Sequence, residues 1–287
     1  MLEDARAKKY AIPAFDVTNY EMIRSVIEVC AEEKSPALFM CLKPDLAGNG
    51  LGFISAMIKH ASEIYKNIPV CMHLDHATDF GDIKDAIDAG FSSVMYDGSV
   101  LPFGENAENT KRVVDYAHAR GITVEAELGH VCDAIAGTGE SALSKNAEVE
   151  NPEDSLTDPG EVERFISITD VDALAVAIGT AHGVYRSKPV LRFDRLEQIN
   201  AISPRPLVLH GGSGTCDEDV QRAIKLGITK INIFSEVLCG LNTGLRDKLN
   251  SIDNMSMWSV YVYENAIENM KEVIRHKIRT FGSENRI

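Results

Sequence analysis

The stretch PVCMHLDHATDFGDIKDAIDAG at residues 69–90 joins a short apolar run to an amphipathic segment. The run Pro69–Leu74 starts at a proline and is mostly apolar, which is typical of a buried β-strand. In the segment Phe80–Ala89, apolar residues recur every three or four positions, as on the buried face of a helix. The stretch therefore predicts one strand followed by one helix.

The same strand-then-helix pattern occurs eight times along the chain. The expected strands are Ala11–Val17, Pro36–Cys41, Pro69–Leu74, Ser92–Tyr96, Ile122–Leu128, Asp172–Ile178, Pro206–His210 and Lys230–Phe234. The expected helices are Tyr20–Glu33, Leu51–Tyr65, Phe80–Ala89, Glu105–Arg120, Pro159–Thr169, Asp194–Ile202, Asp217–Leu226 and Glu236–Leu249. Continuous apolar strands are expected where a parallel sheet is buried on both faces.

Eight such units within roughly 250 residues favour a closed barrel over an open, doubly wound sheet, which is the main alternative. One more helix, at about Val260–Phe281, follows the eighth unit, and no linker divides the chain. We therefore predict an α/β fold: a single (β/α)₈ TIM barrel with a C-terminal helix, forming one domain over residues 1–287.

The composition restricts the possible partners. With 45% hydrophobic and 25% charged residues, the chain is an ordinary globular protein able to bury a large core. Its net charge of −14 repels nucleic acids and anionic membranes, so neither is expected as a partner. No signal peptide or membrane span is apparent. The six cysteines are scattered without a CxxC pair, which favours reduced thiols in a cytoplasmic protein over a disulfide.

Three of the eight histidines lie at or just past the ends of expected strands. His76 follows the third strand, His182 follows the sixth, and His210 ends the seventh. Active sites of barrels lie at the carboxyl ends of the strands. A single histidine there is more often a hydrogen-bonding residue than a ligand. Three at equivalent positions can bind zinc and leave a coordination position open for substrate.

Asp75 directly precedes one of these histidines. A carboxylate at this position could orient an imidazole, or exchange a proton with a substrate hydroxyl beside the metal. His73 shares a strand face with Asp75, because side chains alternate along a strand. We expect His73 to support the site or the core rather than to bind the metal.

A glycine-rich turn, GGSG at Gly211–Gly214, follows the seventh strand and leads into a helix. Glycines let backbone amides approach a phosphate, and a helix N-terminus favours anions. The sequence NIFS at residues 232–235 follows the eighth strand. Because the loops after strands seven and eight form the common phosphate site of barrels, this pairing predicts a phosphorylated substrate.

The segment Gly129–Asp158 interrupts the strand-helix pattern. It is long, polar and contains several glycines, and it leaves the carboxyl end of the fifth strand. Loops of this length are usually functional lids or disordered inserts. We interpret the segment as a lid over the site, with a passive insert as the alternative.

The chain resembles the class II, zinc-dependent fructose-bisphosphate and tagatose-bisphosphate aldolase family. The resemblance spans about residues 11–236 and is most specific in HLDH, IGTAHG and HGGSG. The matching segments, in order, are AIPAFDV, EEKSPALFM, HLDHATD, MYDGSVLPF, VEAELG, DALAVAIGTAHGVY, LVLHGGSG and KINIFSE.

This resemblance implies reversible cleavage of a ketose 1-phosphate or 1,6-bisphosphate to dihydroxyacetone phosphate and an aldehyde. It implies Asp75 as the acid/base at the C4 hydroxyl, and a homodimer or homotetramer. The implied zinc ligands are His76, His182 and His210, with Asp97 and Glu127 at a second or alternative metal position. The implied substrate and phosphate site, near which Na⁺ or K⁺ often binds, comprises Gly183, Gly211, Gly212, Ser213, Asn232 and Ser235.

The chain departs from the family pattern at several positions. Phe234 and Leu238 replace an Asp and a basic residue that contact the distal half of the substrate, and Asp16 replaces the usual Asn. An apolar side chain offers a phosphate no donor, so the aldehyde product is not expected to be triose phosphate. Other basic residues that could still bind a distal anion are Arg186, Lys188, Arg275 and Arg279. The acid that protonates the carbanion is not identified; the possible residues are Asp133, Glu140, Glu148 and Glu150.

Two other functions are weighed against the aldolase. A metal-dependent barrel hydrolase would usually carry an HxH pair on the first strand, whereas AIPAFDV has no histidine. A non-catalytic sugar-phosphate-binding barrel would tolerate loss of Asp75 or of a ligand, and none is lost.

Overall fold

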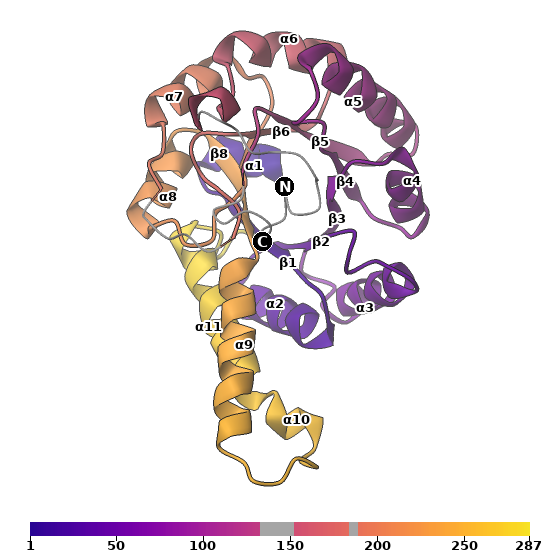
Figure 1. Ribbon diagram of the computed structural model, residues 1–287, viewed down its shortest axis with the longest axis vertical. Helices are drawn as coiled ribbons and strands as arrows, with labels where there is room; N and C mark the ends of the chain where they lie inside the picture. Colours follow the sequence, from indigo (N-terminus) through magenta and orange to yellow (C-terminus); the bar gives the residue numbers. More distant parts are fainter. Residues whose placement is uncertain (133–151, 184–188) are drawn as a thin grey trace.

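The computed structural model describes residues 1–132, 152–183 and 189–287. Eight parallel strands form a closed barrel in chain order, and helices surround it (Figure 1). The predicted (β/α)₈ TIM barrel is thereby confirmed. The strands are β1 (Ile12–Asp16), β2 (Ala37–Cys41), β3 (Val70–Ala77), β4 (Ser93–Tyr96), β5 (Thr123–Leu128), β6 (Ala173–Val176), β7 (Leu207–Leu209) and β8 (Ile228–Ile233).

The helices around the barrel match the expected ones closely; the bounds of α2 and α6 are those predicted. They are α2 (Tyr20–Glu33), α3 (Gly50–Ile64), α4 (Phe80–Asp88), α5 (Phe103–His118), α6 (Pro159–Thr169), α7 (Phe193–Ile202), α8 (Asp217–Lys225) and α9 (Ser235–Asn250). A short helix, α1 (Leu2–Lys8), precedes them. Among the described residues, no helix is both long and apolar enough to cross a bilayer.

The C-terminal segment forms two helices where one was predicted. They are α10 (Ser259–Val262) and α11 (Glu264–Thr280), with Tyr263 between them. Together with α9 they extend away from the ring of helices (Figure 1). Met255 and Trp258, in the connection after α9, are 76% and 77% exposed.

Alternation along the strands separates a core from a polar interior. On β5, Val124, Ala126 and Leu128 pack in the main core between barrel and helices. The intervening residues, Glu125 and Glu127, face the barrel interior, where both approach the imidazole of His210. At the amino ends of the strands, α1 packs through Leu2 and Ala5 against apolar interior residues.

Strand β3 is longer than predicted and irregular. It continues past Leu74 to Ala77, and its register with β4 shifts between these two residues. Within the irregularity, His76 has a φ of 46°, in the left-handed region. Strict alternation would turn His76 away from the face that carries Asp75. The irregularity brings both side chains to the mouth, with His76 Nε2 3.8 Å from Asp75 Oδ2.

Candidate active site

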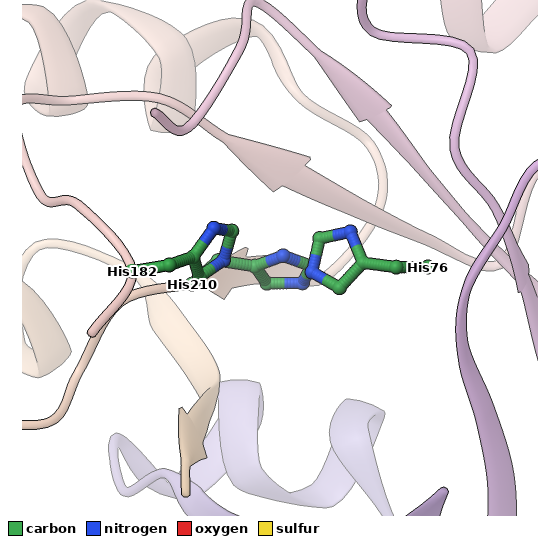
Figure 2. Close-up of side chains that lie close together, drawn as sticks. All are labelled: His76, His182 and His210. Carbon is green, nitrogen blue, oxygen red and sulfur yellow. The ribbon is translucent and has the colours of Figure 1, made fainter. Parts of the chain in front are cut away.

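Three imidazoles, one on β3 and one each from the segments that follow β6 and β7, converge at the carboxyl end of the barrel (Figure 2). The ring centroid of His76 lies 4.9 Å from that of His182 and 4.6 Å from that of His210. Each ring offers one nitrogen, and these nitrogens all lie within 4.8 Å of one another. His182 and His210 are buried, at 2% and 0% exposed. This grouping suits a metal ion held by three imidazoles.

Carboxylates contact two of these rings, at Nδ1 of His76 and at Nε2 of His210. His76 Nδ1 lies 2.8 Å from Asp97 Oδ2, and His210 Nε2 lies 2.9 Å from Glu125 Oε1. Burial alone would raise the pKa of Asp97, but the hydrogen bond and charge of His76, together with hydrogen bonds from Ser99, outweigh burial and hold that pKa below its usual range. Both carboxylates can therefore orient imidazoles, as is common around metal sites.

Burial lowers the pKa of His210, but its contacts with Glu125 and Glu127 outweigh burial and raise the pKa to about 9. A metal ion bound by this imidazole must therefore displace a proton. His182 is fixed differently, because its backbone N–H donates to the carbonyl oxygen of Cys132 at 2.8 Å.

Asp97 and Glu127 form a second group with His76. One ligand atom from each of the three lies within 4.8 Å of the others. Glu127 Oε1 accepts a hydrogen bond from the backbone of Val131 at 2.9 Å, and its Oε2 lies 3.3 Å from His210 Nδ1. The structure thus brings both predicted acids to the histidine cluster.

Asp75 is fully buried beside the histidine cluster. The amide of Asn232 donates to Asp75 Oδ2 at 3.0 Å, and His73 Nε2 lies 3.6 Å from Oδ1. Burial raises the pKa of Asp75, but His76, His73 and Lys230 together hold it well below its ordinary value. Asp75 is therefore ionised and positioned to accept a proton.

Lys230 and Glu125 form a buried pair that the sequence interpretation did not assign. Lys230 Nζ lies 3.0 and 2.9 Å from the two oxygens of Glu125, and the two residues are 1% and 2% exposed. Burial lowers the pKa of Lys230, but the charges of Glu125, Asp75 and Asp16, with the hydrogen bonds to Glu125, together outweigh burial and raise the pKa, so the amine stays protonated. The available signal was a lysine within a strand of a parallel barrel, where buried apolar residues are expected.

The glycine-rich turn after β7 requires its glycines. Gly211 has a φ of 66°, and a Cβ there would lie 2.4 Å from the carbonyl oxygen of Ala181. A Cβ on Gly212 would lie 2.4 Å from Ile231 Cγ2. The turn therefore runs against neighbouring backbone more closely than any side chain allows.

We predict that Gly211→Ala lowers stability by about 1–3 kcal/mol and weakens binding of a phosphorylated ligand. Thermal unfolding and isothermal titration with dihydroxyacetone phosphate measure the two effects. Gly104→Ala is the matched control, because a Cβ at this helical position meets nothing within 4 Å. Equal stability and affinity in the two variants would contradict the role given to the turn.

Three predicted phosphate-site residues, Gly183, Ser213 and Ser235, line one cavity of about 540 Å³ between this turn and α9. Ser213 Oγ accepts a hydrogen bond from the Phe234 backbone at 3.2 Å, which ties together the loops after β7 and β8. The backbone N–H of Gly214 is already bound to Glu236 Oε1 at 2.5 Å. Asn232 lies deeper, bound to Asp75.

Two of the basic residues considered for binding a distal anion form ion pairs with acids of α2. Arg275 lies 2.5 Å from Glu32 and Arg279 lies 2.8 Å from Glu33, both on α2, and these ion pairs occupy their guanidinium groups. Both arginines, considered above as possible ligands of a distal anion, are thus ion-paired with α2. Arg186 and Lys188 lie outside the described residues, as do the four acids considered for the lid and most of the lid segment itself.

Phe234 and Leu238 are half-buried and pack against the main core. Asp16 is buried at the end of β1, and its charge helps to raise the pKa of Lys230. At the end of β8 and the start of α9, the two positions where the sequence departs from the family therefore carry apolar side chains packed on the core.

A closed barrel with acids and histidines grouped at the carboxyl ends of its strands has the architecture of a barrel enzyme. The family model described as fructose-bisphosphate aldolase class-II matches residues 1–286. The chain therefore belongs to the class II fructose-bisphosphate aldolase family, and it is a lyase.

Solved structures agree with this assignment. The YdjI aldolase of Escherichia coli K12 is 32% identical, with a TM-score of 0.84 over 99% of this chain and 96% of that one. A Coccidioides immitis protein provisionally described as a fructose-1,6-biphosphate aldolase is 28% identical, with a TM-score of 0.85 over 99% and 96%. Fructose-bisphosphate aldolase of Campylobacter jejuni, at 21% identity and a TM-score of 0.79 over 100% and 94%, shares the fold.

Proposed function

We propose that the protein is a zinc-dependent aldolase that reversibly cleaves a ketose 1-phosphate or 1,6-bisphosphate to dihydroxyacetone phosphate and an aldehyde. The observation that carries the proposal is the convergence of His76, His182 and His210 beside the buried carboxylate of Asp75. Membership of the class II aldolase family supports the same reaction class.

Zinc fits the donor set at the barrel mouth. Three imidazole nitrogens within 4.8 Å of one another match its preference for nitrogen ligands, and acids hold two of the rings. When bound there, zinc supplies a Lewis acid that polarises the substrate ketone and stabilises the negative charge that develops on its oxygen. Asp97 and Glu127, with His76, would form a second or alternative metal position.

Asp75 performs the first proton transfer. Because it is ionised, it takes the proton of the C4 hydroxyl as the C3–C4 bond breaks and the C4 carbonyl forms. The amide of Asn232 keeps the accepting carboxylate in place. The electron pair of the broken bond stays on the dihydroxyacetone phosphate half, where C3 must then gain a proton. We assign that proton to an acid of the lid, among Asp133, Glu140, Glu148 and Glu150.

The phosphate of the ketose is proposed to bind between the loops that follow β7 and β8. The cavity lined by Gly183, Ser213 and Ser235 supports this location, since it lies beside a glycine-rich turn that precedes a helix. The full proposed set is Gly183, Gly211, Gly212, Ser213, Asn232 and Ser235, with Na⁺ or K⁺ beside it.

Of the two substrate classes we favour a ketose 1-phosphate, because a ketose 1,6-bisphosphate would release triose phosphate and we propose a different aldehyde product. Phe234 and Leu238 supply no hydrogen-bond donor, and Arg275 and Arg279 are paired with acids of α2. We therefore predict that purified zinc-loaded enzyme cleaves fructose 1,6-bisphosphate with a kcat well below about 1 s⁻¹, the low end of typical turnover. A coupled assay for triose phosphate checks this; turnover in the usual enzyme range would contradict it.

We also propose that the protein is a homodimer or homotetramer. The exposed Met255 and Trp258, beyond the end of α9, are the apolar surface that supports association. Sedimentation velocity measures the mass directly, and a 31.5 kDa species at micromolar concentration would contradict the proposal.

The experiment that tests the proposed reaction is proton exchange on dihydroxyacetone phosphate. Zinc-loaded protein is incubated with this compound in deuterated water, and the C3 proton is followed by NMR with and without a chelator. Chelator-sensitive exchange is expected, because the half-reaction needs no aldehyde. Absence of exchange in protein that binds both zinc and phosphate would overturn the proposal in favour of a non-catalytic barrel.

A further inference from the structure

Lys230 places a positive charge inside the barrel, away from the substrate cavity. It projects from β8 and contacts both oxygens of Glu125 on β5, so the pair spans the interior of the closed barrel. Both side chains are almost completely buried. Neither residue is among the three imidazoles proposed to hold zinc.

Stability alone is a weak explanation for this pair. Removing two charges from water is costly, and apolar replacements of buried ion pairs are often neutral or stabilising. The group His73, Asp75 and Glu125 also has the spacing of a metal site, but the ammonium of Lys230 already lies against Glu125. The pair therefore calls for a role in the neighbouring site.

Glu125 connects the lysine to the histidine cluster. Its Oε1 lies 3.0 Å from Lys230 Nζ and 2.9 Å from His210 Nε2. An ammonium has only donors, and a carboxylate beside it only accepts. The proton of the contact with His210 must then be on Nε2, so a metal would bind this ring through Nδ1, in place of the contact of Nδ1 with Glu127.

We infer that Lys230 and Glu125 are positioning residues for the metal centre. Lys230 fixes the Glu125 carboxylate, and Glu125 fixes both the tautomer and the orientation of the His210 imidazole. The inference rests on the proposed function, since it assumes that the three imidazoles bind zinc. It gives the buried lysine a purpose that is neither nucleophilic nor substrate-binding.

Two charge-neutral double variants separate positioning from simple loss of an ion pair. Glu125→Gln with Lys230→Met keeps an acceptor oxygen opposite His210 Nε2, whereas Glu125→Met with Lys230→Met removes it. Lys277→Met is the control for losing a buried lysine, because Lys277 is 3% exposed and paired with Glu236. Thermal unfolding of the zinc-free proteins verifies that each variant folds.

Zinc affinity, from competition with a chelator, and ¹⁵N NMR of the histidine rings are the two readouts. His210→Gln identifies the ring signals of His210. In wild-type protein, His210 is expected to bind zinc through Nδ1 and to keep the proton on Nε2. The double variant Glu125→Met with Lys230→Met, called the methionine pair, is expected to bind zinc about 10–100-fold more weakly than wild type. Such a loss is typical of removing a hydrogen-bond partner of a ligand. The double variant Glu125→Gln with Lys230→Met is expected to bind zinc more tightly than the methionine pair. Lys277→Met is expected to bind zinc as tightly as wild type.

Wild-type affinity in the folded methionine pair, or zinc bound through Nε2 of His210, would overturn the inference while leaving the proposed function intact. Equal weakening in both double variants would also overturn it. Wild-type protein that binds no zinc would overturn the proposed function, and the inference with it.

Discussion

Replacement of Asp75 by Asn is expected to lower kcat for cleavage about 10²–10⁴-fold, the usual contribution of a positioned acid or base. The amide matches the carboxylate in shape but cannot take the C4 hydroxyl proton. Dihydroxyacetone phosphate has no C4 hydroxyl, so its proton exchange should continue in this variant. Turnover and exchange, measured on the same preparation, separate the two steps.

Asp88→Asn is the control for the Asp75 variant, since Asp88 is exposed at the end of α4. It should match wild type in both assays. If Asp75→Asn lost exchange and cleavage equally while still binding zinc, Asp75 would serve the site as a whole rather than the C4 hydroxyl. The role given to it would then be wrong.

Loss of His182 is expected to have the second large effect. His182→Ala leaves two imidazoles where three converge, so zinc affinity should fall by more than about 100-fold, beyond what loss of a ligand's hydrogen-bond partner causes. Chelator-sensitive exchange should disappear with the metal. Zinc content after dialysis against a weak chelator, followed by the exchange assay, measures both.

His60→Ala is the matched control for the ligand variant. His60 is a surface residue of α3 whose side chain is 72% exposed and lies beside Glu63. It should retain full zinc content and exchange. Retention of stoichiometric zinc by His182→Ala would remove this imidazole from the proposed ligand set.

Most of the fold could be predicted from local sequence patterns. Each unit, such as 69–90, combines a short apolar strand run with a helical period, and eight such units leave few topologies open. The three histidines were also predictable, because strand ends meet on one face of a barrel. The β3 irregularity was not, since it depends on pairing with β4 and on the left-handed backbone of His76.

Contacts across the barrel were beyond sequence reasoning. Lys230 and Glu125 are 105 residues apart and meet only because β5 and β8 both face one interior. Arg275 was a reasonable residue for an anion site from its charge alone. Its position on α11 instead places it against Glu32 and Glu33 on α2. In both cases the partner, rather than the residue type, decided the role.

The central claim is that His76, His182 and His210 hold zinc and leave it open to substrate. X-ray absorption at the zinc edge, with and without dihydroxyacetone phosphate, tests this claim most directly. We predict three imidazole nitrogens at about 2.0–2.1 Å, plus light oxygen ligands that change when the compound is added. A closed site with four protein ligands, or one with sulfur at about 2.3 Å, that does not change on addition of the compound would contradict the account.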